Sequence, residues 1–337
     1  MACTVLGAGS WGTALASQLA RRGHDVWVWD IVSELCEAIN RDHRNPRYLK
    51  DVALPENLRG HPDLVEAVSR ARLLVAVVPS HALRSVMVKC ADAVPSDAVI
   101  ACATKGVEEG TLLTMHGLLE DTLPASLHPA ITILSGPSFA AEVARGMPTA
   151  VVIGGRDEPA HLAAEAFHGD AFRCYHTEDV VGVCAGGSLK NVMAIACGVS
   201  DGIGLGLNAR AAIITRGLAE MTRLAVAMGA NPLTMMGLAG MGDLVLTCTG
   251  DLSRNRRVGL ALGKGRTLDD ILEELGEVAE GVITSRSARD LGMKIGVEMP
   301  ITEQVYELIY KGKPAQQAMF ELLARSRKAE RDDQRGA

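Results

Sequence analysis

Two charged residues in the second half of the chain stand where a charge needs a partner. Lys190 lies near the start of a helix expected over 188–199, which is otherwise apolar and contains many small residues. A lysine on an apolar helix face is costly unless it has a counter-ion or reaches solvent. Asp243, which follows two glycines, either caps the next helix or is that counter-ion. A lysine paired in this way can give a proton to a reacting oxygen or take one from it.

A polar cluster follows at 253–257, with the sequence Ser-Arg-Asn-Arg-Arg. Guanidinium forks, an amide, a hydroxyl and the free N–H groups at the start of a helix together suit an oxyanion. A nucleic-acid patch is the alternative, but so short a cluster in a chain of net charge −6 makes a poor one. We therefore predict a site for a small anionic substrate, and a phosphate group fits it best.

The first turn of the chain has the spacing of a dinucleotide-binding fingerprint. A short apolar run leads into Gly-Ala-Gly-Ser-Trp-Gly at 7–12 and then into a helical pattern. Gly7 allows a tight turn, Gly9 lets a pyrophosphate approach the backbone, and Gly12 lets the helix pack closely on the strand. The next strand ends at Asp30, whose carboxylate is placed to bond the hydroxyls of an adenosine ribose. The alternative is that Asp30 only caps the following helix.

Polar residues also follow three later strand-like runs. The run 73–78 is followed by Pro-Ser-His, the run 98–102 by Thr-Lys-Gly after one alanine, and the run 130–134 by Ser-Gly-Pro-Ser. In an open parallel sheet, ligands bind beyond the carboxyl ends of the strands. We therefore expect these residues, Lys105 among them, to line one cleft with the glycine turn, although ordinary loops are polar too.

The elements that must position these residues divide the chain in two. Helical patterns alternate with apolar runs at 4–6, 26–29, 73–78, 98–102, 130–134 and 150–153. This alternation predicts an α/β N-terminal domain of Rossmann type with a parallel sheet, over residues 1–179. Beyond it an all-α C-terminal domain is expected over 180–325, with helices near 188–199, 209–228, 232–237, 256–262, 268–275, 281–291, 301–309 and 315–323. The charged tail, 326–337, has almost nothing to bury and is expected to be disordered.

Composition excludes several classes of function. The 337 residues are 48% hydrophobic and 22% charged, as in an ordinary soluble globule. The net charge of −6 predicts no nucleic-acid partner and no acidic membrane partner. No signal sequence precedes the first strand, and no uninterrupted apolar segment is expected to be long enough to span a bilayer. The eight cysteines and nine histidines show no metal-ligand spacing, which predicts no metal.

Seven motifs occur in order between Val5 and about Tyr310. They are Gly-Ala-Gly-Ser-Trp-Gly-Thr-Ala at 7–14, Val-Pro-Ser at 78–80, Thr-Lys-Gly at 104–106, Leu-Ser-Gly-Pro-Ser-Phe-Ala at 134–140, Leu-Lys-Asn-Val at 189–192, Gly-Asp-Leu at 242–244 and Ser-Arg-Asn-Arg at 253–256. In this order and spacing they closely resemble bacterial NAD(P)-dependent glycerol-3-phosphate dehydrogenases. The resemblance implies an oxidoreductase that interconverts dihydroxyacetone phosphate and sn-glycerol 3-phosphate by hydride transfer. It also implies a role in phospholipid synthesis and a cytoplasmic homodimer.

The resemblance implies a role for each matching residue. Lys190 is the acid/base, with Asp243 as its carboxylate partner. The expected cofactor contacts combine residues of the dinucleotide fingerprint with positions that match cofactor contacts of the family. They are Gly7, Gly9, Ser10, Trp11, Gly12, Asp30, Lys105, Ala140, Arg254, Val278 and Glu280. The substrate contacts are Lys105, Gly136, Ser138, Lys190, Asn191, Asp243, Thr247, Ser253, Arg254 and Asn255.

The cofactor preference rests on one departure from the family. Many members carry an arginine just after the second strand, where it meets the 2′-phosphate of NADP, whereas this chain has Asp30 and Ile31. A carboxylate repels a 2′-phosphate, so NAD is predicted to be preferred to NADP unless Arg41 or Arg44 folds back.

Two other hypotheses remain open. One is a β-hydroxyacid dehydrogenase, which pairs similar domains but acts on a carboxylate and lacks the 253–256 motif. The other is a non-catalytic dinucleotide sensor, which has no need of Lys190 and Asp243.

Overall fold

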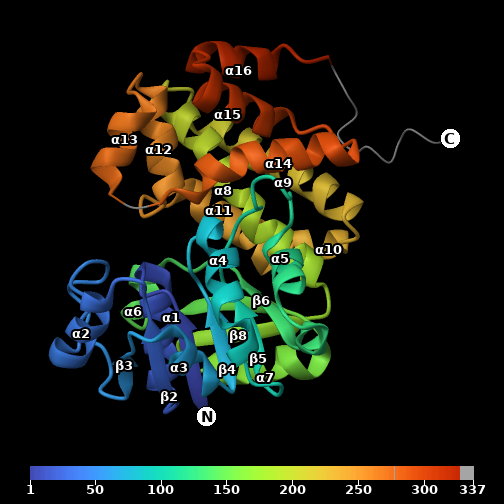
Figure 1. Ribbon diagram of the computed structural model, residues 1–337. Helices are drawn as coiled ribbons and strands as arrows, with labels where there is room; N and C mark the ends of the chain where they lie inside the picture. The colour runs from blue at the N-terminus through green and yellow to red at the C-terminus, as the bar shows by residue number, and fades with distance from the viewer. Residues whose placement is uncertain (277, 327–337) are drawn as a thin grey trace.

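The computed structural model describes residues 1–276 and 278–326. An N-terminal part built on a sheet lies below a helical C-terminal part in Figure 1. The tail predicted to be disordered lies outside the described residues, except for Ser326.

One eight-stranded sheet forms the centre of the N-terminal part, in the order β3-β2-β1-β4-β5-β6-β7-β8. Its strands are β1 (Ala2–Leu6), β2 (Asp25–Trp29), β3 (Leu58–Gly60), β4 (Leu73–Ala76), β5 (Val99–Cys102), β6 (Ile131–Ser135), β7 (Thr149–Gly154) and β8 (Phe172–Thr177). All neighbouring strands are parallel except β6 and β7, which are antiparallel. The predicted Rossmann-type fold class is therefore confirmed, and the expectation of a wholly parallel sheet is wrong at this one pairing.

Helices cover both faces of the sheet, and the alternation of side chains along β4 shows why. Leu73 and Val75 join a core with α1 and α7, whereas Leu74 and Ala76 join a second core with α3, α4 and α5. Strands buried on both faces read as continuous apolar runs, which is how the sequence predicted them. The helices of this part are α1 (Ser10–Arg21), α2 (Ser33–Asp42), α3 (Leu64–Ser69), α4 (Ser80–Cys90), α5 (Met115–Thr122), α6 (Ala140–Ala144) and α7 (Asp157–Phe167), with 3₁₀ turns η1 (Ala91–Ala93) and η2 (Ala125–Ala130).

The described residues beyond 179 are helical, as predicted, and form a third core. The elements are α8 (Val180–Gly202), α9 (Gly206–Ala227), α10 (Pro232–Met235), a π-helical turn η3 (Leu238–Gly242), α11 (Asp243–Thr249), α12 (Arg254–Gly263), α13 (Leu268–Leu275), α14 (Glu280–Ile295), α15 (Pro300–Lys311) and α16 (Ala315–Leu323). Helix α11 was not among the predicted helices, because its seven residues are too few for a clear period.

Helix α8 runs through the middle of the helical part and begins earlier than expected. Its start is fixed by the Asp179 carboxylate, which accepts a hydrogen bond from the Gly182 N–H at 2.8 Å. The glycine pair at 186–187 does not end the helix. A Cβ at Gly186 would lie 2.5 Å from the Ala239 carbonyl oxygen, so glycine is needed there for close packing. Lys190 is consequently in the middle of the helix, and the prediction that it lies near the start is wrong.

The long helix α8 bears on the expectation that no uninterrupted apolar segment is long enough to span a bilayer, because Lys190 interrupts its apolar sequence. With 23 residues, α8 is long and apolar enough to cross a membrane. Of its most apolar window, however, 89% is buried inside the protein. Its apolar character is that of the central helix of a folded core.

Candidate active site

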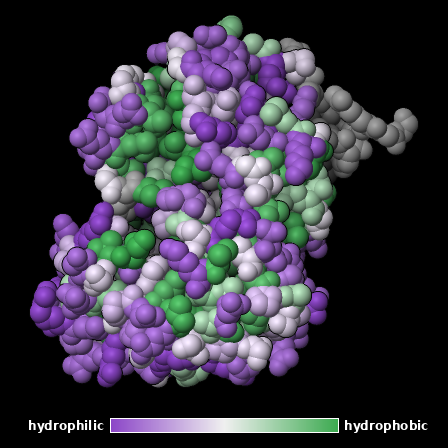
Figure 2. Space-filling model, in the orientation of Figure 1, coloured by the Kyte–Doolittle hydropathy of each residue, from purple (hydrophilic) through white to green (hydrophobic). Residues whose placement is uncertain are grey.

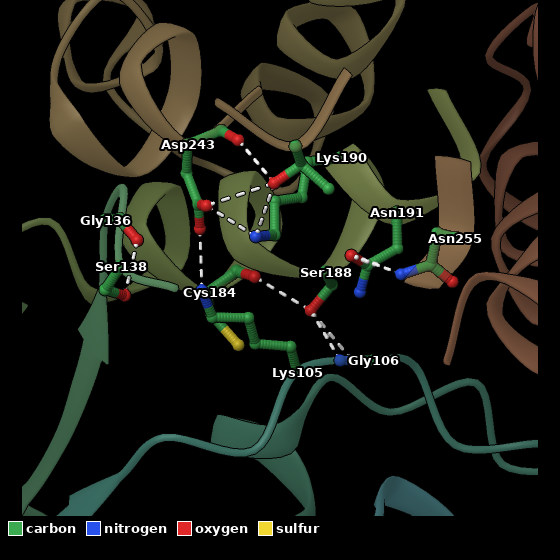
Figure 3. Close-up of polar contacts among 11 residues, drawn as sticks. Lys105, Gly106, Gly136, Ser138, Cys184, Ser188, Lys190, Asn191, Asp243 and Asn255 are labelled. Carbon is green, nitrogen blue, oxygen red and sulfur yellow. Dashed lines mark hydrogen bonds and ion pairs between the residues drawn. The ribbon is translucent and has the colours of Figure 1, made fainter. Parts of the chain in front are cut away.

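Four side chains from three segments meet in one hydrogen-bonded cluster (Figure 3). The Lys190 ammonium, on α8, donates to Asp243 Oδ1 at 2.5 Å and to Thr247 Oγ1 at 2.9 Å. The Lys105 ammonium, from the loop after β5, donates to the other oxygen of Asp243 at 2.6 Å. Asp243 is the first residue of α11, but its carboxylate serves the two lysines. The predicted pairing of Lys190 with Asp243 is therefore present.

Burial sets the charge state of this cluster. The side chains of Lys190 and Asp243 are 10% and 1% exposed. Burial lowers the pKa of Lys190 from its ordinary 10.5 to about 8; Asp243 opposes this shift, and the neighbouring ammonium of Lys105 adds to it. Burial by itself would raise the pKa of Asp243, but the two ammonium groups outweigh it and hold that pKa below its ordinary value. The site thus holds an ionised carboxylate and an amine whose pKa, about 8, is well below that of an ordinary lysine.

Hydrogen bonds between the two halves of the chain hold the loop that carries Lys105. The Ser188 hydroxyl, two residues before Lys190 on α8, accepts a hydrogen bond from the Gly106 N–H at 3.0 Å. Ser287 Oγ on α14 donates to the Val107 carbonyl at 2.8 Å. The loop after β5 is therefore bonded to the helical part at the two residues that directly follow its lysine. Neither serine was among the predicted site residues, because a hydroxyl alone carries no sequence signal.

The start of α12 lies against α8 beside Lys190. Asn255 Nδ2 donates to Asn191 Oδ1 at 3.0 Å, and Asn255 Oδ1 accepts from the Gly281 N–H at 2.9 Å. Ser253 caps α12 by accepting from the Arg256 N–H at 3.2 Å. Arg254 is the first residue of α12. The predicted anion-binding residues thus come together at one helix N-terminus, next to the lysine cluster.

The turn between β1 and α1 has the geometry that a pyrophosphate requires. Gly7 has a φ of +110°, and a Cβ on Gly12 would lie 1.8 Å from the Gly7 carbonyl oxygen, so both positions require glycine. A Cβ on Gly9 would meet nothing within 4 Å, and α1 has no side-chain cap. Among the described residues, the buried Trp11 Nε1 has no hydrogen-bond partner. Open backbone, free helix N–H groups and an unused donor fit a bound dinucleotide.

This turn lies where the sheet order reverses, between β1 and β4, which is the usual ligand position in such folds. The molecular surface is hollowed between the sheet-containing part and the helical part, as Figure 2 shows.

Asp30 and a residue that was not predicted shape the glycine turn. Asp30 Oδ2 accepts from the Ala8 N–H at 2.7 Å and Oδ1 from the Val32 N–H at 3.0 Å. Its carboxylate therefore holds the turn and the start of the next segment. Asn45, fully buried, donates to the Ala8 carbonyl at 2.7 Å and to Thr13 Oγ1 at 2.8 Å. Its place in an irregular loop gave no signal in the sequence.

The remaining predicted residues lie in two further segments, 136–140 and 278–280. Glu280, at the start of α14, accepts from the Ser80 N–H at 3.0 Å and from its hydroxyl at 2.5 Å, which ties the helical part to the start of α4. Val278 is 37% exposed beside it. Ser138 Oγ donates to the Gly136 carbonyl at 2.9 Å, and Ala140 begins α6 in the same segment. No group of three metal-ligating side chains occurs within 1–276 or 278–326, and the metal-free site stays a prediction.

Comparison with known proteins identifies the family. Models of the NAD-dependent glycerol-3-phosphate dehydrogenase N-terminus and C-terminus match residues 2–161 and 179–320. The chain is 55% identical to glycerol-3-phosphate dehydrogenase [NAD(P)+] of Myxococcus xanthus over 328 residues, covering 97% of this chain and 98% of the relative. The Anaeromyxobacter dehalogenans enzyme of that name is 53% identical over 331 residues, 98% of this chain and all of the relative.

A solved structure gives the same result for the fold. The crystal structure of glycerol-3-phosphate dehydrogenase from Coxiella burnetii matches with a TM-score of 0.91 and 40% identity, over 96% of this chain and 99% of that one. The resemblance carried by the seven motifs is thereby confirmed over nearly the whole length. The chain belongs to the NAD-dependent glycerol-3-phosphate dehydrogenase family.

Proposed function

We propose that the chain interconverts dihydroxyacetone phosphate and sn-glycerol 3-phosphate by hydride transfer with NAD(P)H, and that Lys190 supplies the proton. Membership of the family makes the chain an oxidoreductase that uses NAD or NADP. The observation that carries the proposal is the buried Lys190–Asp243 pair. Asp243 also binds Lys105 from the loop after β5, and Asn191, next to Lys190, binds Asn255 at the start of α12. Neither a carboxylate-specific dehydrogenase nor a silent sensor is favoured, because close relatives share the family's name.

The residues divide the reaction between them. Gly9, Ser10 and Trp11 would hold the dinucleotide, whose reduced nicotinamide would supply the hydride when bound. The Lys190 ammonium donates its proton to the carbonyl oxygen of the substrate as negative charge develops there. Asp243 and Thr247 orient that ammonium through the bonds described above. Arg254 and Asn255 hold the phosphate, so that binding energy remote from the carbonyl orients the reacting carbon.

The other predicted contacts fall into the same two sites. Gly7, Gly12, Asp30, Ala140, Val278 and Glu280 belong to the cofactor side of the cleft, and Lys105, Gly136, Ser138, Asn191 and Ser253 to the substrate side. Lys105 has a further effect in the free enzyme. It shares Asp243 with Lys190, and its positive charge helps to lower the pKa of the Lys190 amine.

The depressed pKa of Lys190 predicts a pH dependence with opposite signs in the two directions. Reduction of dihydroxyacetone phosphate requires the protonated amine, so its kcat/KM should fall as pH rises through about 8. Oxidation of glycerol 3-phosphate requires the neutral amine and should rise over the same range. Steady-state rates across this range measure both. A reduction rate that stays level up to the pH where an ordinary lysine deprotonates would contradict the assignment.

The end of β2 predicts a preference for NAD. Ile31 is 80% exposed, Arg41 pairs with Asp42, and Arg44 donates to the Lys50 carbonyl. A 2′-phosphate would meet the Asp30 carboxylate, and repulsion of about 1–4 kcal/mol between charges about 4 Å apart corresponds to a roughly fivefold or greater loss. We expect kcat/KM for NADH to exceed that for NADPH by at least this factor.

The variant Ile31→Arg should narrow that ratio, because it adds a cation and leaves the Asp30–Ala8 bond in place. Equal specificity constants for the two cofactors in the wild-type enzyme would refute the preference.

A substrate panel tests the proposed reaction. With saturating NADH, dihydroxyacetone phosphate should be reduced far faster than unphosphorylated dihydroxyacetone or a three-carbon keto acid. Faster reduction of the keto acid would favour a β-hydroxyacid dehydrogenase. Binding of NADH without turnover of any compound would favour a sensor.

The proposal extends to the organisation of the protein. Domains are assigned to 1–179 and 180–325, since α8 starts at Val180 and the model of the family's C-terminal part begins at residue 179. The enzyme is proposed to act in the cytoplasm as a homodimer, without nucleic-acid or membrane partners. Sedimentation equilibrium should give twice the mass of one chain, and the mass of a single chain would refute the dimer.

A further inference from the structure

Helices α8 and α12 cross in direct backbone contact, through glycines spaced four residues apart on each helix. A Cβ on Gly198 would lie 2.1 Å from the Arg256 carbonyl oxygen, and one on Gly259 would lie 2.0 Å from the Ile195 carbonyl oxygen. One turn further on, a Cβ on Gly202 or on Gly263 would lie 2.5 Å from a carbonyl oxygen of the other helix. Real Cβ atoms are not found so near a backbone oxygen. The two helices are therefore in a contact that allows no side chain larger than hydrogen at these positions.

A buried ion pair fastens the same crossing. Arg256, on α12, donates from Nε at 3.1 Å and from Nη2 at 2.8 Å to Asp201 Oδ2 near the end of α8. Arg210, on α9, donates from Nε to Asp201 Oδ1 at 2.8 Å. The side chains of Asp201 and Arg256 are only 7% and 10% exposed. One carboxylate thus holds guanidinium groups from two other helices.

The pair joins the two chemical centres of the helical part. Lys190 and Asp201 lie on one helix, 11 residues or about 16 Å apart along its axis. Arg256 directly follows Arg254 and Asn255, the residues proposed to hold the phosphate. Asn255 touches α8 again at Asn191, beside Lys190. The packing of α12 on α8 therefore sets the distance between Lys190 and the phosphate-binding residues Arg254 and Asn255.

We propose that Asp201 is a positioning residue, which seats α12 through Arg256 and so fixes the reach between Lys190 and the phosphate-binding residues. The inference rests on the proposed function, because it takes the N-terminus of α12 as the phosphate site. Asp201 touches neither substrate nor cofactor in this account. Its effect should therefore appear only with a substrate that spans both centres, and be absent when the phosphate handle is missing.

The test compares two substrates in Asp201→Asn, a change that keeps the shape of the side chain and removes its charge. We expect kcat/KM for dihydroxyacetone phosphate to fall about 10- to 100-fold, the loss expected when reacting groups are misplaced by about 1 Å. For unphosphorylated dihydroxyacetone it should change by less than about threefold, and the dissociation constant of NADH should stay the same. Equal losses with both substrates, or no loss with either, would overturn the inference.

Asp251→Asn is the matched control. Asp251 binds the same guanidinium, accepting from Arg256 Nη1 at 2.7 Å, but its side chain is 95% exposed. An exposed ion pair contributes little, so both substrates should react as with the wild-type enzyme. A phosphate-specific loss in this control would show that Asp201 has no special part.

If Asp201→Asn fails to fold, Arg256→Lys replaces it. This variant keeps the charge and much of the packing but loses the fork that grips Asp201, and it should give a smaller loss of the same phosphate-dependent kind. Equal losses with both substrates would again overturn the inference. A wild-type enzyme that shows no preference for the phosphorylated ketone would instead refute the proposed function, so the two failures are distinct.

Discussion

Replacing Lys190 by Met should lower kcat for reduction of dihydroxyacetone phosphate by about 10²–10⁴-fold, the usual contribution of a positioned general acid. Methionine fills much of the same space, so the buried site keeps its packing, but it has no proton to give. The dinucleotide turn lies on the other half of the chain and keeps all of its own contacts. Affinity for NADH, measured by fluorescence titration, should therefore remain close to that of the wild-type enzyme.

The pH profile makes this prediction sharper. Whatever activity remains in Lys190→Met should lose the inflection near pH 8, because the group that produces it is gone. Thr247→Val is a useful companion, since it removes one hydrogen bond to Lys190 and leaves the amine paired with Asp243; its loss should be much smaller. Wild-type turnover in Lys190→Met would remove this residue from the proposed role.

Replacing Arg254 by Ala should weaken the transition state for the phosphorylated substrate specifically. A hydrogen bond to a charged group contributes about 1.5–3 kcal/mol, so kcat/KM for dihydroxyacetone phosphate should fall about 10- to 200-fold. With NADH kept saturating, dihydroxyacetone without phosphate should react nearly as before. The measurement is the ratio of the two specificity constants.

Arg257→Ala provides the control for charge. Arg257 belongs to the same polar cluster, 253–257, and lies three residues after Arg254 on α12, but it is exposed. Its removal should leave the ratio unchanged. If Arg254→Ala still discriminates between the phosphorylated and unphosphorylated ketones as well as the wild-type enzyme does, the phosphate is bound elsewhere.

The fold could be predicted where burial leaves a pattern in the chain. Strands covered on both faces, such as β4, appear as unbroken apolar runs. The two strands that the sequence did not predict show no such run. Strand β3 has only three residues, and β8 carries exposed Arg173 and His176 along a sheet edge. The early start of α8 was missed for a different reason. Glycines usually end helices, and only the three-dimensional neighbours of Gly186 show that it is there for close packing.

The site could be predicted where chemistry makes a residue unusual in its own segment. Lys190 in an apolar helix called for a counter-ion, and Asp243 supplies it. Contacts between distant segments left no such sign. Lys105 meets Asp243 across 138 residues, and Ser188 meets Gly106 across 82. Lys105 was expected in the cleft and Asp243 was expected as a counter-ion, but nothing in either local sequence pairs the two with each other. Only the folded chain shows these contacts.

The most direct test of the central claim is a crystal structure of the enzyme with NADH and glycerol 3-phosphate bound together. The account predicts Lys190 Nζ within hydrogen-bonding distance, about 3 Å, of the oxygen on the middle carbon. The same carbon should face the nicotinamide ring, with the phosphate on Arg254 and Asn255. A phosphate bound away from α12, or Lys190 still turned away from the substrate, would contradict it.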